Sequence, residues 1–227
     1  MKPAVVMLVR DEADIVFDSL LFWEWLGVTE FYICDNASRD ETPNILKRFA
    51  ASKKLNVRLS HESATDWPGR RVINALKDQA VDDGCDWIFP ADADEFLDIP
   101  FVSVEDWIRS LECDKGWGEL PYLNILPNGK KNWQRPQKKA FGVIDKSMTI
   151  SMGNHLIEGV PPTINVLGGH YQHYSIRNYE QFKRKMENYM VAFNQSSFKD
   201  HPHAVSHKLW QEQGEDYIKQ LWEDLTK

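Results

Sequence analysis

The chain has 227 residues, of which 42% are hydrophobic and 27% charged, so it is long enough to fold as one large domain around a sizeable core. Its 27 Lys and Arg residues and 34 Asp and Glu residues give a formal net charge of −7. Binding to nucleic-acid phosphates needs a positive surface, so this charge argues against general nucleic-acid binding. Three widely separated cysteines, without the spacing of a zinc site, fit a reducing cytosol.

The first half of the chain alternates predicted strands and helices. Apolar runs of strand length occur at residues 4–9, 31–34, 55–59 and 87–89. Helical patterns lie between them, at residues 15–26, 42–51 and 70–80. Thr42 is the predicted cap of the second helix, because Pro43 fits the first helical position. The alternation predicts an α/β fold, with a parallel sheet and helices on both of its faces.

The second half of the chain has a different rhythm. Ser103 and Asp106 form a capping box that predicts a short helix to residue 111, and residues 118–174 are interpreted as short strands with loops. Within them, residues 130–139 carry five basic residues and no acidic one. A solvated loop is the preferred interpretation of this segment, and a surface for an anionic acceptor or lipid head groups is the alternative. Two amphipathic helices are expected near the C-terminus.

No membrane span is expected from the sequence. The apolar run at residues 4–9 ends at once at Arg10, too early for a secretory signal. Nowhere does the chain approach the ~18 apolar residues that cross a bilayer. We therefore expect a cytoplasmic protein, with peripheral contact as its one form of membrane association.

Polar side chains follow each predicted strand of the first half, at residues 10–12, 35–36, 61–71 and 92–95. In an open parallel sheet, ligands bind beyond the carboxyl ends of the strands. The carboxylates of Asp92, Asp94 and Glu95 would repel one another there unless a cation were present. Carboxylate oxygens suit Mn²⁺ or Mg²⁺, which also bridge the phosphates of a nucleotide. A solvated acidic turn is the alternative, because a lone Asp-x-Asp is common.

Several motifs occur in one order along the chain. Val-Arg-Asp-Glu-Ala-Asp at residues 9–14 is similar to a Lys-Asn-Glu-Ala segment, and residues 35–42 look like an Asp-Asn-x-Ser-x-Asp-x-Thr turn. Residues 92–97 look like Asp-x-Asp-Glu-Phe-Leu. Together these motifs resemble those of the family 2 glycosyltransferases. The resemblance implies a GT-A fold: a Rossmann-like, mostly parallel sheet flanked by helices, followed by a mixed α+β acceptor half and C-terminal helices.

The resemblance also implies a domain plan and an activity. A single GT-A domain would cover residues 1–227, with a nucleotide-sugar-binding half at 1–100, an acceptor-side half at 101–178 and C-terminal helices at 179–227. The enzyme would be a metal-dependent, hexosyltransferase-like glycosyltransferase that uses Mn²⁺ or Mg²⁺. It would move a sugar, with inversion, from a nucleotide-diphospho-sugar, expected to be a UDP-sugar, to an acceptor hydroxyl. The acceptor would be a glycan, a lipid-linked compound or another hydroxyl compound.

Individual residues receive roles from the same resemblance. Glu12 and Asp35 would hold the nucleoside. Asp92 would be shared between the ribose and the metal, and Asp94 would bind the metal on the diphosphate, where a carboxylate can act only through a cation. Further donor contacts would come from Arg10, Arg71, Asn74, Ala93 and Arg177. For Arg71, a charged helix start is an equally good interpretation.

A later motif resembles the family's His-Tyr-x-x-Lys-Ser-x-x-Glu-Phe-x-x-Lys. It makes His173 a further metal ligand, since a neutral imidazole suits such a site, although the nearby His170 competes for the role. Arg177 stands where the family has the lysine that neutralises the diphosphate. Three more histidines near the C-terminus suggest metal by spacing alone, but a solvated loop is the simpler interpretation: His201, His203 and His207.

The implied transfer needs a base for the acceptor hydroxyl. Glu119, Asp145 and Glu158 lie in the half expected to build the acceptor pocket, and we favour Glu158 as the catalytic base. Asp94, as the metal ligand, would be the second catalytic residue. Two other functions stay open. A nucleotidyltransferase would carry a glycine-rich, basic loop after its first strand, and residues 10–13 are Arg-Asp-Glu-Ala instead. A non-catalytic nucleotide-sugar-binding module would bind the donor without releasing or transferring its sugar.

Overall fold

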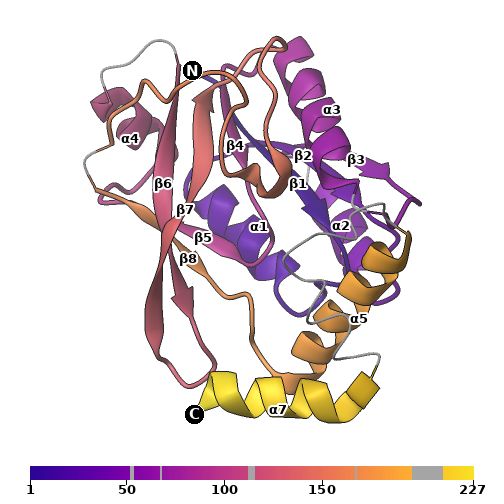
Figure 1. Ribbon diagram of the computed structural model, residues 1–227. Coiled ribbons are helices and arrows are strands. Elements are labelled where there is room, and N and C mark those ends of the chain that lie inside the picture. Colours follow the sequence, from indigo (N-terminus) through magenta and orange to yellow (C-terminus); the bar gives the residue numbers. More distant parts are fainter. Residues whose placement is uncertain (52–53, 67, 112–115, 167, 196–211) are drawn as a thin grey trace.

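The computed structural model describes residues 1–51, 54–66, 68–111, 116–166, 168–195 and 212–227. The strands in them are β1 Pro3–Val9, β2 Glu30–Asp35, β3 Asn56–His61, β4 Trp87–Pro90, β5 Glu95–Asp98, β6 Gly116–Ile125, β7 Lys131–Val143 and β8 His170–His173. The helices are α1 Val16–Trp25, α2 Thr42–Ala50, α3 Gly69–Asp82, α4 Val104–Ser110, α5 Tyr179–Gln195 and α7 Glu215–Thr226, with a 3-10 turn, η1, at Met152–Asn154. All of these strands join one sheet in the order β3-β2-β1-β4-β7-β6-β8-β5 (Figure 1).

The first four strands form the parallel part of the sheet. β1 lies between β2 and β4 and runs parallel to both, and β3 runs parallel to β2. Alternate residues of β1 enter two different cores: Val5 and Met7 face α1 and α2, whereas Ala4 and Val6 face α3. Helices therefore cover both faces of the parallel strands, as the alternating sequence pattern predicts.

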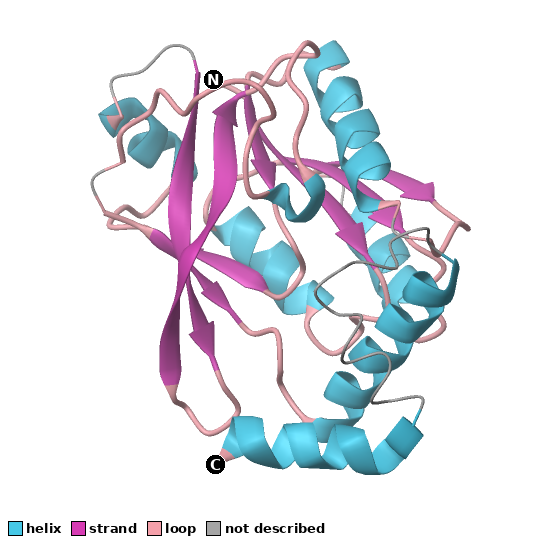
Figure 2. Cartoon of the chain, viewed as in Figure 1, coloured by secondary structure: helices cyan, strands magenta, loops and turns pink. Residues whose placement is uncertain are grey.

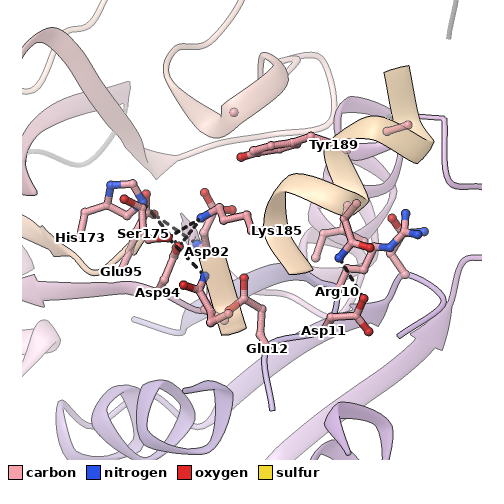
Figure 3. Close-up of a pocket in the computed structure, with 18 of the residues that line it drawn as sticks. Arg10, Asp11, Glu12, Asp92, Asp94, Glu95, His173, Ser175, Lys185 and Tyr189 are labelled. Atoms are coloured by element: carbon pink, nitrogen blue, oxygen red, sulfur yellow. Dashed lines mark hydrogen bonds and ion pairs between the residues drawn. The ribbon is translucent and has the colours of Figure 1, made fainter. Parts of the chain in front are cut away.

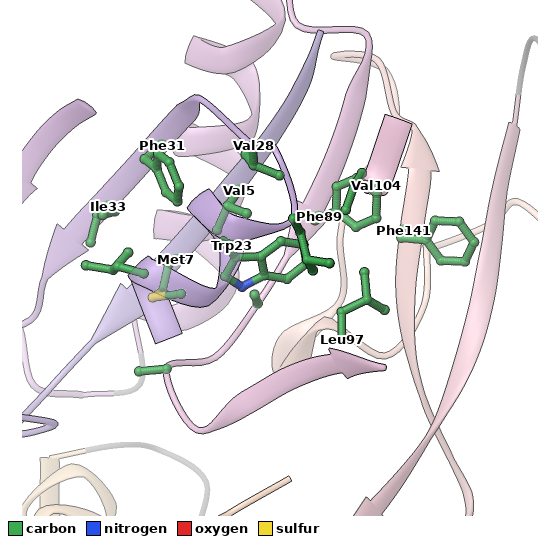
Figure 4. Packing of buried hydrophobic residues seen from close by; sticks show 14 of the residues in the cluster. Val5, Met7, Trp23, Val28, Phe31, Ile33, Phe89, Leu97, Val104 and Phe141 are labelled. Atoms are coloured by element: carbon green, nitrogen blue, oxygen red, sulfur yellow. The ribbon is translucent and has the colours of Figure 1, made fainter. Parts of the chain in front are cut away.

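Large aromatic side chains fill the core on the α1 side (Figure 4). Trp23 of α1 is fully buried and lies 5.5 Å from Phe89 of β4, measured between ring centroids. Phe89 stacks in turn on Phe141 of β7 at 5.9 Å. Because Phe141 belongs to the second half of the chain, these contacts pack both halves around one core.

The α3 side of the sheet fixes the connection after β7. Val72 and Leu76 of α3 pack in the second core. Lys77 is 1% exposed, and its Nζ donates to the backbone oxygens of Asp145 at 3.0 Å and Met148 at 2.7 Å. A buried ammonium needs such acceptors, so α3 holds the segment that leads to η1.

The second half of the sheet differs from the sequence prediction of short strands and loops. β6 and β7 have ten and thirteen residues and pair antiparallel over most of their length. The basic segment is strand β7 and not a solvated loop. Lys138 is exposed and pairs with Glu119, whereas its neighbour Lys139 points to the opposite face and is buried. A strand with one buried face is recognised by hydrophobic residues at every second position. The basic segment lacks this pattern, because its inward-facing position 139 is itself a lysine.

The predicted helix caps have different outcomes. Ser103 caps α4, and its Oγ accepts a hydrogen bond from the backbone N–H of Asp106 at 3.1 Å, as predicted. The prediction for α2 was wrong by one residue, because Glu41 is the cap and Thr42 is already helical. The Thr42 hydroxyl instead accepts from the backbone N–H of Glu12 at 2.9 Å. This bond ties the start of α2 to the loop after β1.

Among the residues that the structure describes, two helices follow the last strand, as expected. α5 lies beside the loops that leave the parallel strands, and α7 packs against it (Figure 2). In the part of the chain that the structure describes, no helix is both long and apolar enough to cross a membrane. The three C-terminal histidines, His201, His203 and His207, lie outside the described residues.

Candidate active site

A cavity of about 520 Å³ lies at the carboxyl ends of β1 and β4 (Figure 3). The loops after these two strands form its floor. Side chains of β6, β7 and β8 and the turn η1 line one side, and α5 lines the other. The cavity is thus at the edge of the sheet where the sequence places its ligand. Of the residues with predicted roles, it is lined by Arg10, Glu12, Asp92, Ala93, Asp94 and His173.

The acidic turn after β4 is largely buried. Asp94 is 4% exposed and Glu95 is 1% exposed. The backbone N–H of Glu95 donates to the carbonyl of Asp92, and the Glu95 carboxylate accepts from the backbone N–H of Asp92, at 3.1 and 3.2 Å. This tight turn excludes the alternative of a solvated acidic loop, since two of its carboxylates face the interior.

His173 lies across from these carboxylates and is oriented by a neighbour. Its Nδ1 is 2.6 Å from the side-chain oxygen of Asn124 on β6. That oxygen accepts, so Nδ1 carries a proton, and Nε2 faces Asp94, whose Oδ2 is 3.6 Å away. His170 lies at the other end of β8 beside Asp98, so His173 is the histidine at the cavity.

Potential metal-ligand atoms converge at this point. One atom each from Asp94, Glu95 and His173 lie within 4.8 Å of one another. Two carboxylates and an imidazole suit Mn²⁺ or Mg²⁺, and a ligating histidine is usually held through its other nitrogen, as Asn124 holds His173. The donor chemistry therefore fits a divalent ion. Asp92 is not in this group, and Glu95, a supporting residue in the sequence interpretation, takes its place.

Two lysines contact the acidic turn from other elements. Lys139 of β7 is 2.6 Å from Asp92 and 2.8 Å from Glu95, and its Nζ also donates to the carbonyl of Gly153 at 3.0 Å. Lys185 of α5 is 2.9 Å from Asp94. These cations hold the carboxylates in place, and they give a phosphate-bearing ligand local positive charge inside an acidic protein.

Arg177 connects the loop after β1 to the entrance of α5. Its guanidinium pairs with Glu12 at 2.5 Å and with Asp14 at 2.7 Å, and it approaches Asp94 to 3.9 Å. Arg177 therefore lies next to Asp94, although it is not among the residues that line the cavity. Glu12 and Arg177 form an ion pair, which the sequence could not show because the two residues are far apart along the chain.

The electrostatics of the described residues leave negative charge in excess. Burial raises the pKa of Glu95 to about 7, and nearby Asp92 and Asp94 add to this effect. Burial and Asp94 raise the pKa of Glu12 to about 7 as well. The pKa of Asp94 is held well below its ordinary value, because Lys185 and His173 outweigh its burial. Adding a divalent cation would relieve the carboxylates that still repel one another.

Three predicted donor contacts lie outside the cavity lining, and a fourth reaches it. Asp35 is buried beside His61, with Nδ1 to Oδ2 at 3.2 Å, and its neighbour Asn36 lines the cavity in its place. Arg71 pairs with Glu62 outside the cavity. Asn74 bonds the backbone N–H and oxygen of Ile150, which is a role in packing. Arg10 reaches the cavity, and its buried Nε has no hydrogen-bond partner among the described residues.

The structure does not bring the favoured base to the cavity. Glu158 receives two hydrogen bonds from Arg70, at 2.8 and 2.5 Å, and does not line the cavity. The other two carboxylates are also absent from its lining: Glu119 pairs with Lys138, and Asp145 accepts from the backbone of Ser147. The structure therefore places Glu158 away from the cavity, because the chain turns back after η1 toward α3.

Several cavity residues were not assigned by the sequence interpretation. Lys185 lies within the quoted motif, and Lys139 lies within the basic segment, so each had a signal. His155 had none, and neither had Asn124, which holds His173 from outside the cavity lining, because their positions depend on how the second half of the sheet folds back. On α5, Asn188 donates to Asp11 at 2.9 Å and accepts from Arg39 at 2.9 Å, which fixes the helix over the cavity.

Comparison with known proteins supports the fold. No protein-family model and no curated protein sequence matches the chain. Three crystal structures of S. aureus TarS resemble it. TarS 1-349 in complex with UDP-GlcNAc has a TM-score of 0.50 and 12% sequence identity, over 93% of this chain and 78% of that one. TarS 1-349 in complex with UDP has a TM-score of 0.48 and 14% identity, over 87% and 67% of the two chains, and a further TarS structure has a TM-score of 0.37 and 17% identity, over 57% and 23%. The chain thus matches about a quarter of the protein chain in the third of these structures. The alignment with the UDP-GlcNAc complex confirms the expected GT-A-like fold, a mostly parallel sheet flanked by helices.

Proposed function

We propose that the chain is a metal-dependent glycosyltransferase that takes a sugar from a nucleotide-diphospho-sugar. The observation that carries this proposal is the convergence of Asp94, Glu95 and His173 at the carboxyl ends of the parallel strands, with Lys185 beside them. Such a group suits a cation bound to a diphosphate. A structure with this fold contains UDP-GlcNAc, so UDP-sugars are the first donors to test.

The donor would lie along the floor of the cavity. Glu12, Arg10 and Asn36 would accept or donate hydrogen bonds to the nucleoside, and Asp92 would approach the ribose. Lys185 and Arg177 would face the diphosphate. Their positive charge would stabilise the nucleoside diphosphate as it leaves, which is the charge that develops in the transition state.

Asp94, Glu95 and His173 would hold Mn²⁺ or Mg²⁺. In a neutral His173 ring with its proton on Nδ1, Nε2 would be an acceptor facing Oδ2 of Asp94 at 3.6 Å, and a cation between them would satisfy both atoms. When bound, the ion would neutralise the diphosphate and polarise it as a leaving group. Lys185 would then share the Asp94 carboxylate with the ion.

The remaining parts of the proposal concern the acceptor side. The acceptor is proposed to be a hydroxyl of a glycan, of a lipid-linked compound or of another small molecule, attacking with inversion opposite the leaving group. A cytoplasmic location with peripheral membrane contact fits this plan. The strands β6 and β7 and the turn η1 would form the acceptor wall, since they face the floor across the cavity.

The proposal is tested by thermal unfolding with nucleoside diphosphates and nucleotide sugars, with Mn²⁺ or with EDTA. A ligand at a hundred times its Kd stabilises the folded state by about 2.7 kcal/mol. We expect a rise in Tm that needs both UDP-GlcNAc, or another donor, and the metal, followed by release of UDP. Asp94→Asn should abolish the joint effect, whereas Asp98→Asn, at an exposed carboxylate that ends β5, should retain it.

Different outcomes separate the alternative functions. Metal-dependent binding without release of UDP or transfer of sugar would indicate a binding module. Release of pyrophosphate from a nucleoside triphosphate and a sugar phosphate would indicate a nucleotidyltransferase. If no nucleotide shifts Tm with Mn²⁺, or if Asp94→Asn behaves as the parent, the proposal is wrong.

A further inference from the structure

The acceptor side of the cavity must supply the group that takes the hydroxyl proton, if the proposed transfer is right. The carboxylates of the acidic turn are poorly placed for this. Glu95 is 1% exposed, and its two oxygens already bond Lys139 and the backbone N–H of Asp92. Asp94 pairs with Lys185, and Glu12 lies in the loop after β1, across from the acceptor wall. The base should therefore come from a side chain of the acceptor wall itself.

Three titratable side chains line that wall among the described residues: Tyr122, Lys139 and His155. Lys139 is paired with two carboxylates. His173 of the neighbouring strand β8 belongs to the candidate metal group. Burial raises the pKa of Tyr122, so its phenol stays protonated. His155 is the remaining group, and no ion pair joins it to another described residue.

The contacts of His155 define which of its nitrogens is basic. Its Nδ1 lies 2.8 Å from the backbone oxygen of Lys138. A carbonyl oxygen only accepts, so Nδ1 carries the proton, and Nε2 of the neutral ring is left as an acceptor. The ring stacks on Tyr122, with centroids 6.3 Å apart and planes inclined by 17°. Backbone and aromatic contacts thus hold the imidazole in one orientation.

Gly153 lets the His155 ring lie close against the main chain. Its φ is +77°, and a Cβ at this position would come within 2.8 Å of the His155 Nε2. A glycine here therefore permits both the left-handed turn and the position of the imidazole, which a side chain would displace.

The charges around His155 keep the ring neutral. Burial lowers its pKa most, and the nearby Lys139 and His173 lower it further. The carbonyl of Lys138 and the carboxylate of Asp92 act in the opposite direction without reversing the effect. A neutral imidazole with a free lone pair is the form that a general base needs.

We propose that Nε2 of His155 is the general base of the transfer. The acceptor oxygen forms a bond to the anomeric carbon while the bond from that carbon to the phosphate oxygen breaks. The bonding electrons leave with the nucleoside diphosphate, and the acceptor proton moves to Nε2. The product side then holds an imidazolium, which returns its proton to solvent.

The test compares His155→Asn with the parent. The asparagine amide nitrogen occupies the place of Nδ1 and can still donate to Lys138, so the variant removes Nε2 and keeps the structural bond. Release of UDP from UDP-GlcNAc, or from whichever donor shifts Tm, is followed with Mn²⁺ and with water or glycerol as acceptor. We expect kcat to fall about 10²- to 10⁴-fold, with donor Kd changed less than twofold.

The pH profile gives a readout that a purely structural role would not move. In the parent, kcat should fall on the acid side as Nε2 takes a proton, and this limb should be absent in His155→Asn. The matched control is His170→Asn, which changes a histidine outside the cavity and should retain the parent's kcat and acid limb. An unchanged kcat in His155→Asn overturns the assignment of the base.

A measurement without turnover separates this inference from the proposed function. Nitrogen-15 NMR of the labelled chain reports which imidazole nitrogen carries the proton. We expect His155 to be protonated at Nδ1 at neutral pH, and a proton on Nε2 would overturn the inference whatever the enzyme activity. Absence of nucleotide binding would instead count against the proposed function.

Discussion

Lys139 is the residue of the basic segment that contacts the acidic turn after β4. Its side chain is 3% exposed, and it comes from the middle of β7 to lie between Asp92 and Glu95. A buried carboxylate without a partner is costly, so the acidic turn after β4 depends on a cation from a distant strand. The proposed metal ion and this lysine would have similar effects. Both carry positive charge, which offsets the repulsion between neighbouring carboxylates.

Replacing this cation tests its role in stability. Lys139→Gln should lower the free energy of unfolding by about 3–5 kcal/mol, because it leaves the buried carboxylate of Glu95 without its partner. Urea denaturation at neutral pH measures the change. Lys138→Gln is the control, since its exposed pair with Glu119 should be worth less than about 1 kcal/mol. Similar losses in the two variants would contradict the special role of Lys139.

At the scale of elements, the junction between β4 and β7 joins the parallel and antiparallel parts of the sheet. Gly142 of β7 is registered with Ile88 of β4 and with Trp117 of β6. Its φ is +144°, and a Cβ there would lie 2.5 Å from the backbone oxygen of Gly116. Backbone atoms cannot move aside as a flexible side chain can, so this position requires glycine.

A methyl group at this junction should therefore be damaging. We expect Gly142→Ala to lower the free energy of unfolding by more than about 2 kcal/mol, as strain and overpacking do elsewhere. Gly69→Ala is the control, because Gly69 begins α3 with ordinary φ and its Cβ would meet Leu8 at a comfortable 3.9 Å. Chemical denaturation of both variants measures the difference. A Gly142→Ala protein as stable as the control would show that β7 can shift to relieve the contact.

Element prediction succeeded where hydrophobic pattern and local chemistry agree. The four parallel strands, their helices and the Ser103 cap were all predictable, because apolar runs and capping hydroxyls act over a few residues. The cap of α2 was misplaced because the Thr42 hydroxyl has a tertiary partner, the N–H of Glu12. The long strands β6 and β7 were read as short pieces and loops for the same reason: their partners are distant.

At the scale of the whole molecule, aromatic packing joins the parallel strands to the second half of the chain. Phe141 is fully buried, and its ring lies 5.0 Å from Trp107 of α4 and 5.9 Å from Phe89 of β4. The cavity is built by both halves, with its floor from β1 and β4 and its walls from β6, β7, β8 and α5. Stability and the site should consequently depend on the same contacts.

Removal of this ring tests that dependence. Phe141→Ala should cost about 3–5 kcal/mol of the free energy of unfolding, because it leaves a cavity among large rings. Tryptophan fluorescence and far-ultraviolet circular dichroism should still report one coincident transition, since both halves share the core. Phe101→Ala, at a ring that is 37% exposed, is the control and should change stability little. Two separate transitions in Phe141→Ala would indicate halves that unfold independently.

The sequence alone determined the parallel sheet, the placement of Asp92, Asp94 and Glu12 at its edge, and the choice of a nucleotide-diphosphate ligand as the leading hypothesis. These features depend on local pattern: an apolar strand followed directly by charge. Only the tertiary structure decided which carboxylates are buried, which histidine faces them, and that Glu158 is paired with Arg70 away from the cavity. Those outcomes depend on contacts between residues tens of positions apart, and no local pattern encodes such distances.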